Sequence, residues 1–358
     1  MRIIGNIITY LFSDFNFRGT KMTQKHNITI DDIARDLGVS KTTVSRAISG
    51  KGRISDATRE RVMAYIQECN YRPNAAARGL AENRTYNLAL VLPKSFIHLN
   101  SPFYRNIMNA ICEEAFNWDY NIVICLSTEE FPESLKRTLD NRKVDGVILS
   151  RTVEQDGLVD MLHQRGIPFS TIGSLPPEIH SWATVEADHD HIGGCRAFTL
   201  SFLQGSQEKV ALLGNDMRYI VNQSRYAGFQ QAVTALKYPL ENVHMRSGLN
   251  KPAECSAAVQ ELLAQGIRKF LCMDDDICLY TLAALMQAGK KIPEDVQIAS
   301  LFDSEKLSAS PIGISALRFD ASELGTLACR ELLRCLKDEE YDPSPILGYR
   351  VINRESTL

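Results

Sequence analysis

The chain has 358 residues, of which 44% are hydrophobic and 23% are charged, with a formal net charge of -3. This composition excludes a largely disordered chain, and the length exceeds what one usual core contains. No apolar run has the length of a membrane span, so we expect no contact with a membrane. The nine cysteines are odd in number and form no C-x-x-C pair, which favours reduced thiols in a cytoplasmic protein.

The charge is unevenly distributed along the chain. Residues 21–85 hold 12 Lys and Arg against 7 Asp and Glu, a net of +5, whereas the chain after residue 85 carries -9. A local excess of positive charge attracts phosphates and makes binding to nucleic acid sensitive to salt. The pattern predicts a small basic head and a larger acidic body that takes no part in phosphate binding.

The first residues are predicted to lie outside any folded domain. The apolar start at residues 3–12 resembles a weak signal peptide, but it lacks a small-residue cleavage site. We therefore expect residues 1–27 to be a disordered extension, with Met22 as a possible native start.

The segment that follows has the pattern of a helix-turn-helix. Thr29 and Asp32 have the spacing of a capping box, and Gly38 gives the backbone freedom needed where the first helix ends. Ser40 and Ser55 are placed to cap a second and a third helix. Apolar residues at helical spacing predict one small core under these helices, made of Ile30, Ile33, Ala34, Leu37, Val44, Ile48, Val62 and Ile66.

The second helix leaves polar and basic side chains on its outer face, namely Lys41, Thr42, Ser45 and Arg46. Such a helix can lie in the major groove of DNA, where polar side chains near its N-terminus meet base edges. The alternative is an ordinary solvated helix face. The order of caps, turn and exposed polar helix favours DNA as the partner.

A short helix is predicted next, with Asn74 as its cap. Two helical turns are too few for an isolated helix to be stable in water, so this helix should fold only with a partner. Leu80 at its exposed end suits an apolar wedge between base steps in the minor groove. Packing of Leu80 on the following domain is the alternative.

Short apolar runs alternate with helical stretches throughout the rest of the chain. This alternation is typical of parallel α/β sheets, and its extent predicts two doubly wound lobes with a ligand cleft between them. The predicted strands are Leu88–Leu92, Ile122–Cys125, Val147–Leu149, Phe169–Ile172, Val210–Leu213, Phe270–Met273 and Ile298–Leu301. The expected domains are a disordered extension at 1–27, a helix-turn-helix domain at 28–72, a hinge helix and linker at 73–85, and a two-lobed effector-binding and dimerisation domain at 86–358.

Three motifs together resemble the lactose repressor/galactose repressor (LacI/GalR) family of bacterial transcription regulators. They are Val39-Ser40 with Thr43-Val44-Ser45-Arg46, then Thr58-Arg59-x-Arg61-Val62, and finally Tyr71-x-Pro73-Asn74-x-x-Ala77-Arg78-x-Leu80. The resemblance implies an all-α head with a hinge helix and a body like the type I periplasmic binding proteins. It further implies that the chain crosses between the lobes near Asp188–Asp190, near Leu317–Asp320 and again towards the C-terminus. The DNA contacts that we expect are Lys41, Thr42, Ser45, Arg46, Ser49, Ala77 and Leu80, with Ser49 standing where many relatives have Asn.

Effector contacts are predicted at Arg225, Asp275 and Phe103. An exposed Arg225 guanidinium beyond a strand end can hold two ligand oxygens, and Asp275 can accept hydrogen bonds from neighbouring hydroxyls. Both positions match ligand-binding residues of the family, although relatives usually have Asn where this chain has Asp274. Alternatively these acids only cap the helix that starts near Ile277, and Phe103 either stacks on a ligand or packs in the core.

A metal site is not expected. The run from Asp188 to His191 places His189 and His191 on one face of an extended segment. In the family this segment joins the lobes, so His189 is expected near the cleft or crossover.

The function that we expect is sequence-specific DNA binding by a transcriptional repressor under allosteric control. The expected partners are double-stranded operator DNA, a second copy of the chain in a homodimer, and a small-molecule effector, a sugar or sugar phosphate that acts as an inducer. No cofactor and no enzymatic activity are expected, and the protein should be cytoplasmic, associated with the nucleoid when bound to its operator. The alternatives are a purine- or nucleoside-responsive regulator of the same family and a periplasmic-type sugar-binding protein.

Overall fold

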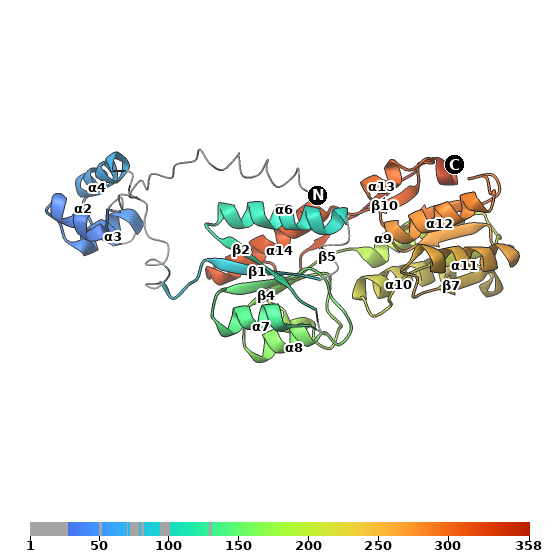
Figure 1. Ribbon diagram of the computed structural model, residues 1–358, viewed down its shortest axis with the longest axis horizontal. Coiled ribbons are helices and arrows are strands. Elements are labelled where there is room, and N and C mark those ends of the chain that lie inside the picture. Colours follow the sequence, from blue (N-terminus) through green and yellow to red (C-terminus); the bar gives the residue numbers. More distant parts are fainter. Residues whose placement is uncertain are drawn as a thin grey trace, which may run out of the picture. The chain divides into compact units, whose positions relative to one another are not determined.

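The computed structural model describes residues 28–49, 52–69, 71, 79, 82–93, 101–128 and 131–358. The chain divides into two compact units, with the boundary between Glu82 and Asn83 (Figure 1). Each unit has its own buried core. None of the helices in the described ranges is long and apolar enough to span a membrane.

The first unit is a bundle of three short helices, α2 (Ile30–Asp36), α3 (Lys41–Ser49) and α4 (Asp56–Glu68). Thr29 and Asp32 form the predicted capping box at the start of α2, and Ser55 caps α4. The centre of the bundle is made of Ile33, Ala34, Val44, Ala47 and Val62. These residues come from all three helices, so the small core fixes how the helices pack.

The first lobe of the second unit, the N-lobe, is a six-stranded parallel sheet in the order β11-β5-β4-β3-β1-β2. Helices α6 (Pro102–Asn117) and α14 (Ala321–Leu336) pack on the sheet within one buried core, and α7 (Glu133–Asp140) and α8 (Gly157–Gln164) share a second core with it. A 3-10 turn, η2, spans His180–Trp182. The strands are β1 (Asn87–Leu92), β2 (Asn121–Leu126), β3 (Gly146–Leu149), β4 (Phe169–Ile172), β5 (Val185–His189) and β11 (Ile346–Leu347).

The second lobe, the C-lobe, is a six-stranded sheet in the order β12-β10-β9-β8-β6-β7, in which only the β10–β12 pair is antiparallel. Its helices are α9 (His191–Leu203) and α10 (Ile220–Ala235) in one core, α11 (Pro252–Ala264) and α12 (Asp275–Gln287) in another, and the short α13 (Glu305–Ser308). Its strands and 3-10 turns are β6 (Val210–Leu213), β7 (Val243–Arg246), β8 (Lys269–Cys272), β9 (Gln297–Ser300), β10 (Ser315–Arg318), β12 (Arg350–Ile352), η3 (Leu240–Asn242) and η4 (Glu355–Thr357).

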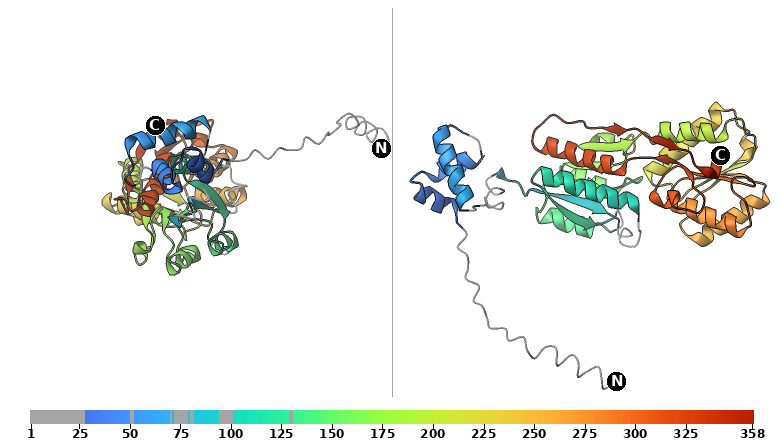
Figure 2. Two further views of the ribbon diagram at one scale, coloured as in Figure 1. Left: turned by 90° about the vertical axis from the view of Figure 1, so that its left-hand side faces the viewer. Right: turned by 90° about the horizontal axis from the view of Figure 1, so that it is seen from above.

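The chain crosses between the two lobes three times (Figure 2). Strand β5 leads into α9 at Asp190, β10 leads into α14 at Phe319 and Asp320, and β11 leads into β12 at Gly348 and Tyr349. Each lobe therefore contains distant parts of the sequence. Since three short connections join the lobes, we expect each lobe to move as a rigid body in a hinge motion about these connections.

The predicted fold class is confirmed: an all-α head precedes two α/β lobes built on parallel sheets. All seven predicted strands are present within a residue of their predicted ends. The predicted hinge helix from Asn74 to Leu80 falls almost entirely outside the described residues.

Candidate functional site

Helix α3 presents the predicted DNA-reading face. Its inner residues Val44 and Ala47 are buried in the core of the head, at 0% and 4% exposure. Lys41, Thr42, Ser45 and Arg46 are all exposed. The side chain of Ser49 and both Ala77 and Leu80 lie outside what the structure describes.

The turn between α2 and α3 is braced from two sides. Ser40 caps α3, since its hydroxyl accepts from the backbone N–H of Thr43 at 3.1 Å. From α4, the Arg61 guanidinium donates to the carbonyl of Leu37, and the Tyr65 hydroxyl donates to Asp36 at 2.7 Å. These contacts hold the start of α3 in place, where a recognition helix makes its base contacts.

The exposed side chain of Arg46 on α3 lies next to Gly52, in the loop that follows the helix. Gly52 has a positive φ of 89°, and a Cβ atom there would lie 3.0 Å from Cδ and Nε of Arg46. Glycine therefore leaves room for the Arg46 side chain to pass across the loop.

The predicted effector residues lie where strands of both lobes end. Phe103 is on α6 of the N-lobe, whereas Arg225 on α10 and Asp275 on α12 belong to the C-lobe. Phe302, in the loop after β9, connects them. Its ring centre is 5.9 Å from that of Phe103, and the Arg225 guanidinium carbon lies 5.6 Å from the same ring.

The expectation of an exposed guanidinium at Arg225 is wrong. Arg225 lies in the second turn of α10 and is 7% exposed, because Phe302 covers it. Burial lowers its pKa, whereas Asp274 and Asp275 are among the acidic groups that raise it. Its Nε has no hydrogen-bond partner among the described residues, although one terminal nitrogen donates to Asn222 at 3.5 Å.

Asp275 is likewise buried, at 8% exposure, and burial raises its pKa. The cap of α12 is Asp274 rather than Asp275, since Asp274 accepts from the backbone N–H of Ile277 at 2.8 Å. Oδ2 of Asp275 has no hydrogen-bond partner within the described ranges and lies 3.8 Å from Nζ of Lys306. Capping therefore accounts for Asp274 but leaves the Asp275 carboxylate available.

The lobes also touch through their backbones at residues 152–154 and 218–220. The N–H of Glu154 donates to the carbonyl of Arg218 at 2.8 Å, and the N–H of Ile220 donates to the carbonyl of Thr152 at 3.2 Å. The Arg151 guanidinium reaches the Tyr219 hydroxyl at 2.5 Å. Together with the Phe103–Phe302 pair, these contacts join the lobes and leave Arg225 and Asp275 inside the molecule.

An open cavity of about 510 Å³ lies between the lobes beside the crossovers. Phe103, Phe302 and Tyr349 contribute to its lining, but neither Arg225 nor Asp275 does. The accessible cavity and the buried Arg225 therefore meet at the Phe302 ring, and movement of this ring would join them.

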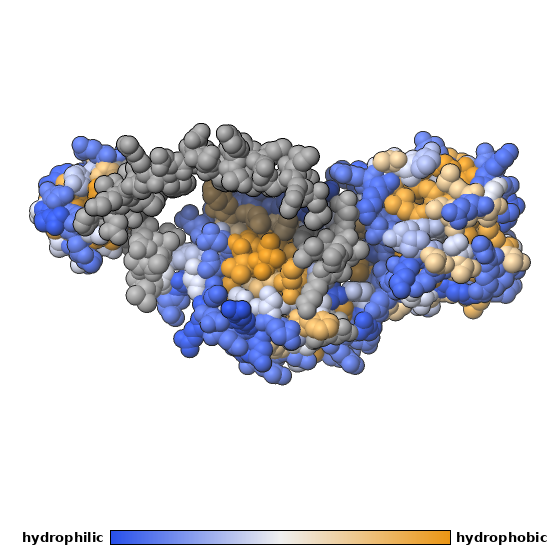
Figure 3. All heavy atoms as spheres, viewed as in Figure 1, coloured by the Kyte–Doolittle hydropathy of each residue, from blue (hydrophilic) through white to orange (hydrophobic). Residues whose placement is uncertain are grey.

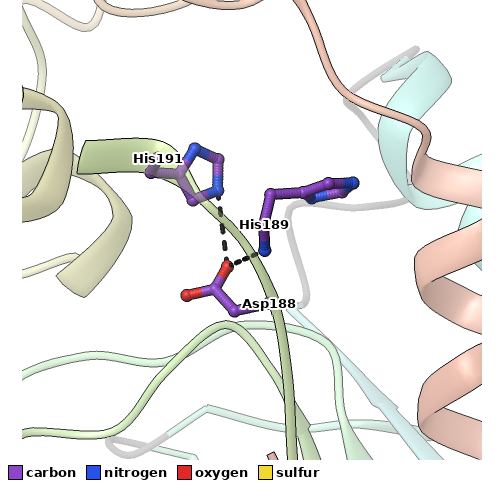
Figure 4. A group of neighbouring side chains, drawn as sticks. All are labelled: Asp188, His189 and His191. Carbon is purple, nitrogen blue, oxygen red and sulfur yellow. Dashed lines mark hydrogen bonds and ion pairs between the residues drawn. The ribbon is translucent and has the colours of Figure 1, made fainter. Parts of the chain in front are cut away.

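The three polar residues at the first crossover are packed together (Figure 4). The Asp188 carboxylate accepts from the backbone N–H and hydroxyl of Ser174 and from the N–H of His189, and lies 3.5 Å from Nε2 of His191. The His189 ring points away from this carboxylate (Figure 4). Both imidazole rings instead pack on Phe319, with ring centres 5.0 and 4.4 Å away.

Both histidines of this cluster are neutral near pH 7. Burial lowers the pKa of His189 to about 4 and that of His191 well below its ordinary value. The neutral rings and the already hydrogen-bonded carboxylate are the features of a packed crossover. His189 thus lies at the crossover, where it was expected.

Two residues next to Arg225 were not predicted from the sequence. Phe302 follows β9, so the rule that ligands meet the carboxyl ends of parallel strands could have identified it. Asn222 lies three residues before Arg225 on α10, a spacing that brings two helical side chains together.

Comparison with known proteins agrees with both units. Residues 29–74 match the family described as bacterial regulatory proteins, lacI family, and residues 201–357 match the periplasmic binding protein-like domain. The catabolite control protein A of Streptococcus mutans is 26% identical over 339 residues, covering 94% of this chain and 99% of that protein. The transcriptional repressor PurR of Haemophilus influenzae is 26% identical, covering 84% of this chain and 85% of the relative.

Solved structures show the same architecture. A complex of the transcriptional regulator CelR with cellobiose is 26% identical, has a TM-score of 0.67, and covers 92% of this chain and 99% of its own. The lac repressor dimer bound to operator and the anti-inducer ONPF has a TM-score of 0.73 at 21% identity, with the same coverage of both chains. The chain therefore combines a lacI-family DNA-binding head with a periplasmic-binding-protein-like body, and it is similar over most of its length to regulators of the LacI family.

Proposed function

We propose that this regulator is a repressor that leaves its operator when a carbohydrate binds between the lobes of the body. The observation that carries the proposal is a buried donor and a buried acceptor, Nε of Arg225 and Oδ2 of Asp275, neither with a hydrogen-bond partner in the described part of the chain, although Lys306 lies 3.8 Å from the Asp275 oxygen. Leaving such groups unpaired costs about 1–3 kcal/mol each. A hydroxyl can both accept from the guanidinium and donate to the carboxylate, so a polyhydroxylated ligand suits both groups.

The operator contacts that we propose are Lys41, Thr42, Ser45 and Arg46 on α3. Arginine pairs well with guanine in the major groove, and exposed hydroxyls can contact bases or phosphates. We propose that Ser49 adds a contact at the end of the helix. Ala77 and Leu80 would complete the site from the hinge, with Leu80 entering the minor groove.

We further propose that the protein acts as a homodimer in the cytoplasm. One head reads half a site, so two-fold symmetry suits a pseudo-palindromic operator. Apolar surface lies on the face of the body seen in Figure 3, over both the N-lobe near α6 and the C-lobe near α12. The exposed apolar side chains of the body include Phe116 and Ile124 in the N-lobe and Met286 on α12. A partner copy would bury this surface.

Effector control follows if the ligand changes how the lobes close. Phe103 and Phe302 come from different lobes, so a ligand that moves the Phe302 ring changes the contact between them. In a dimer this shift would alter the spacing of the hinge helices and oppose their folding on DNA. The effector acts through its different affinity for the two states, without catalysis by the protein.

A purine or nucleoside is the second candidate effector. The Phe103 and Phe302 rings support it, because flat bases stack on aromatic side chains. Two features of this chain argue against an exported sugar-binding protein: the basic charge of residues 21–85 and the exposed polar face of α3.

The first test measures binding of the purified full-length protein to fragmented DNA of its source organism at near-physiological salt. Enrichment of a few pseudo-palindromic sites is expected, whereas uniform binding contradicts a sequence-specific reader. Release from the recovered operator is then measured with neutral sugars, sugar phosphates, purines and nucleosides in parallel. Release by neutral sugars alone supports the proposal, and release by purines alone replaces it with the second candidate.

The Arg225→Met variant tests the site itself. It keeps the length and apolar packing of the side chain but removes all its donors, so operator affinity should persist while the response to the effector falls at least tenfold. Arg246→Met, which removes an arginine paired with Glu261 at the end of β7, is the control. An unchanged response in Arg225→Met would place the effector elsewhere.

A further inference from the structure

A line of side-chain hydrogen bonds runs from the start of α12 to Arg225. Oδ2 of Asp274 accepts from the side-chain amide of Asn215 at 3.0 Å. The Asn215 oxygen accepts from the amide of Asn222, and the Asn222 oxygen accepts from Nη1 of Arg225 at 3.5 Å. The four residues come from three segments that follow β6 and β8, so their sequence positions alone do not reveal the line.

The direction of this line is fixed at its Asp274 end. Oδ1 of Asp274 is already used as the cap of α12, by the N–H of Ile277 at 2.8 Å. As a carboxylate, Asp274 only accepts, so Asn215 must turn its NH₂ group toward it and its oxygen toward Asn222. Asn222 in turn presents its oxygen to Arg225, while its NH₂ group also donates to the carbonyl of Asp216 at 2.9 Å.

We propose that Asp274 is a positioning residue, which sets the orientation of the Arg225 guanidinium through Asn215 and Asn222. The inference rests on the proposed role of Arg225 in holding the effector. Phe302 limits the guanidinium from one direction, at 5.6 Å from its ring centre, and Asn222 holds Nη1. With Nη1 of Arg225 held by Asn222, Nε of the same guanidinium is buried and has no hydrogen-bond partner among the described residues. Asp274 thereby acts on the effector without touching it.

The replacement Asp274→Asn tests the direction of the line. An Asn at this position still caps α12 with its oxygen, but its NH₂ group then faces the NH₂ group of Asn215. Two donors facing each other cannot bond, so Asn215 and Asn222 must either turn over or separate. If they turn over, Asn222 presents NH₂ to Arg225 and the guanidinium loses its acceptor.

A second replacement should repair the first. In the double variant Asp274→Asn, Asn222→Asp, the amides run in the opposite direction and end at a carboxylate that accepts from both Asn215 and Arg225. This carboxylate cannot donate to the carbonyl of Asp216, so the double variant restores the acceptor of Arg225 but not the bond to Asp216. The single variant Asn222→Asp should be disturbed, because Asn215 then has acceptors on both sides. If the two replacements only removed packing independently, their effects on Arg225 would add. Recovery in the double variant would instead show that the two positions are coupled.

The measurement follows the Nε–H group of Arg225 by NMR in full-length protein labelled with ¹⁵N-arginine, which needs no effector. Its signal is assigned by its absence in Arg225→Lys. Each single variant should shift this signal and speed its hydrogen exchange at least tenfold, and the double variant should restore both. Asp276→Asn is the matched control, since Asp276 lies in the same acidic run but pairs with Lys306 at 2.8 Å.

Two results would overturn the inference: an unchanged Arg225 signal in Asp274→Asn, or a double variant no closer to wild type than the single variants. Circular dichroism and the melting temperature establish that each variant is folded. The result is independent of the proposed effector role, which fails separately if Arg225→Met responds to the effector like the wild type. Once an effector is known from the operator-release panel, the single variants should weaken it about tenfold and the double variant should recover most of this loss.

Discussion

The buried His189 makes a sharp prediction for stability as a function of pH. Burial lowers the pKa of this histidine from 6.5 to about 4 in the folded chain. Below pH 6.5 the unfolded chain takes up a proton that the folded chain refuses, so the free energy of unfolding falls as pH falls toward 4. A difference of about 2.5 in pKa corresponds to about 3 kcal/mol.

The assay compares the wild type with His189→Asn by urea denaturation between pH 4 and pH 8. Fluorescence reports on the N-lobe, because Trp118 and Trp182 are the two tryptophans of the chain and both belong to that lobe. The variant should be destabilised at pH 8 through lost packing on Phe319, and this deficit should shrink by about 3 kcal/mol toward pH 4. His163→Asn controls for loss of an exposed histidine in the same lobe, with its unfolding followed by circular dichroism because the His163 ring stacks on Trp182 at 4.2 Å. A deficit that stays constant with pH would refute the assignment of His189 as a neutral buried group.

Four further predictions concern the head and the cleft. Arg46→Ala should lower discrimination between operator and other DNA by about 1–3 kcal/mol in competition binding, and an equal loss on random DNA would make it a phosphate contact. Gly52→Ala should weaken operator binding more than Gly38→Ala does, because both have positive φ but only at Gly52 would the new methyl meet Arg46. Leu80→Ala should weaken specific binding more than nonspecific binding, and equal losses would exclude a minor-groove wedge. Asp274 should change the free energy of unfolding with pH in the direction opposite to His189. Burial raises the pKa of Asp274 from 3.8 to about 6, so the folded chain binds a proton more tightly than the unfolded chain. The resulting stabilisation is present below pH 4 and is lost as pH rises through 6. Asp274→Asn should therefore improve in relative stability by about 3 kcal/mol between pH 4 and pH 7, measured by urea denaturation with circular dichroism because both tryptophans lie in the N-lobe. A change of opposite sign would contradict the burial of Asp274.

Several of the strands that could be predicted have a uniform environment. Leu88–Leu92 and Val210–Leu213 are buried along their whole length, and a continuous apolar run is the pattern of such strands. Strand β5 was missed because Glu186 and Asp188 interrupt its apolar pattern. Both are buried, and they accept hydrogen bonds from backbone N–H groups of the chain after β4, which no local pattern records.

The site was predictable in part, for a related reason. Strand ends and family motifs indicated Arg225 and Asp275, but the ring that lies over the Arg225 guanidinium comes from another segment, at Phe302. The capping alternative was assigned to both acids, and the structure gives the cap to Asp274 alone. The line of amides from Asp274 to Arg225 needs three segments in contact, so only the folded chain reveals it.

Two features of the cleft have opposite effects on the stability of the arrangement in which the lobes are in contact, and their balance determines how far an effector can shift it. Contacts made by the chain itself already join the lobes, through Phe103 with Phe302 and through an ion pair of Arg105 with Glu305 at 3.7 Å. Yet this arrangement leaves both Nε of Arg225 and Oδ2 of Asp275 without a hydrogen-bond partner among the described residues. A ligand that pairs with both in only one arrangement of the lobes contributes about 2–6 kcal/mol of differential affinity. Since about 5.5 kcal/mol converts a 1:99 equilibrium to 99:1, this small set of groups is enough to switch the body between its two states.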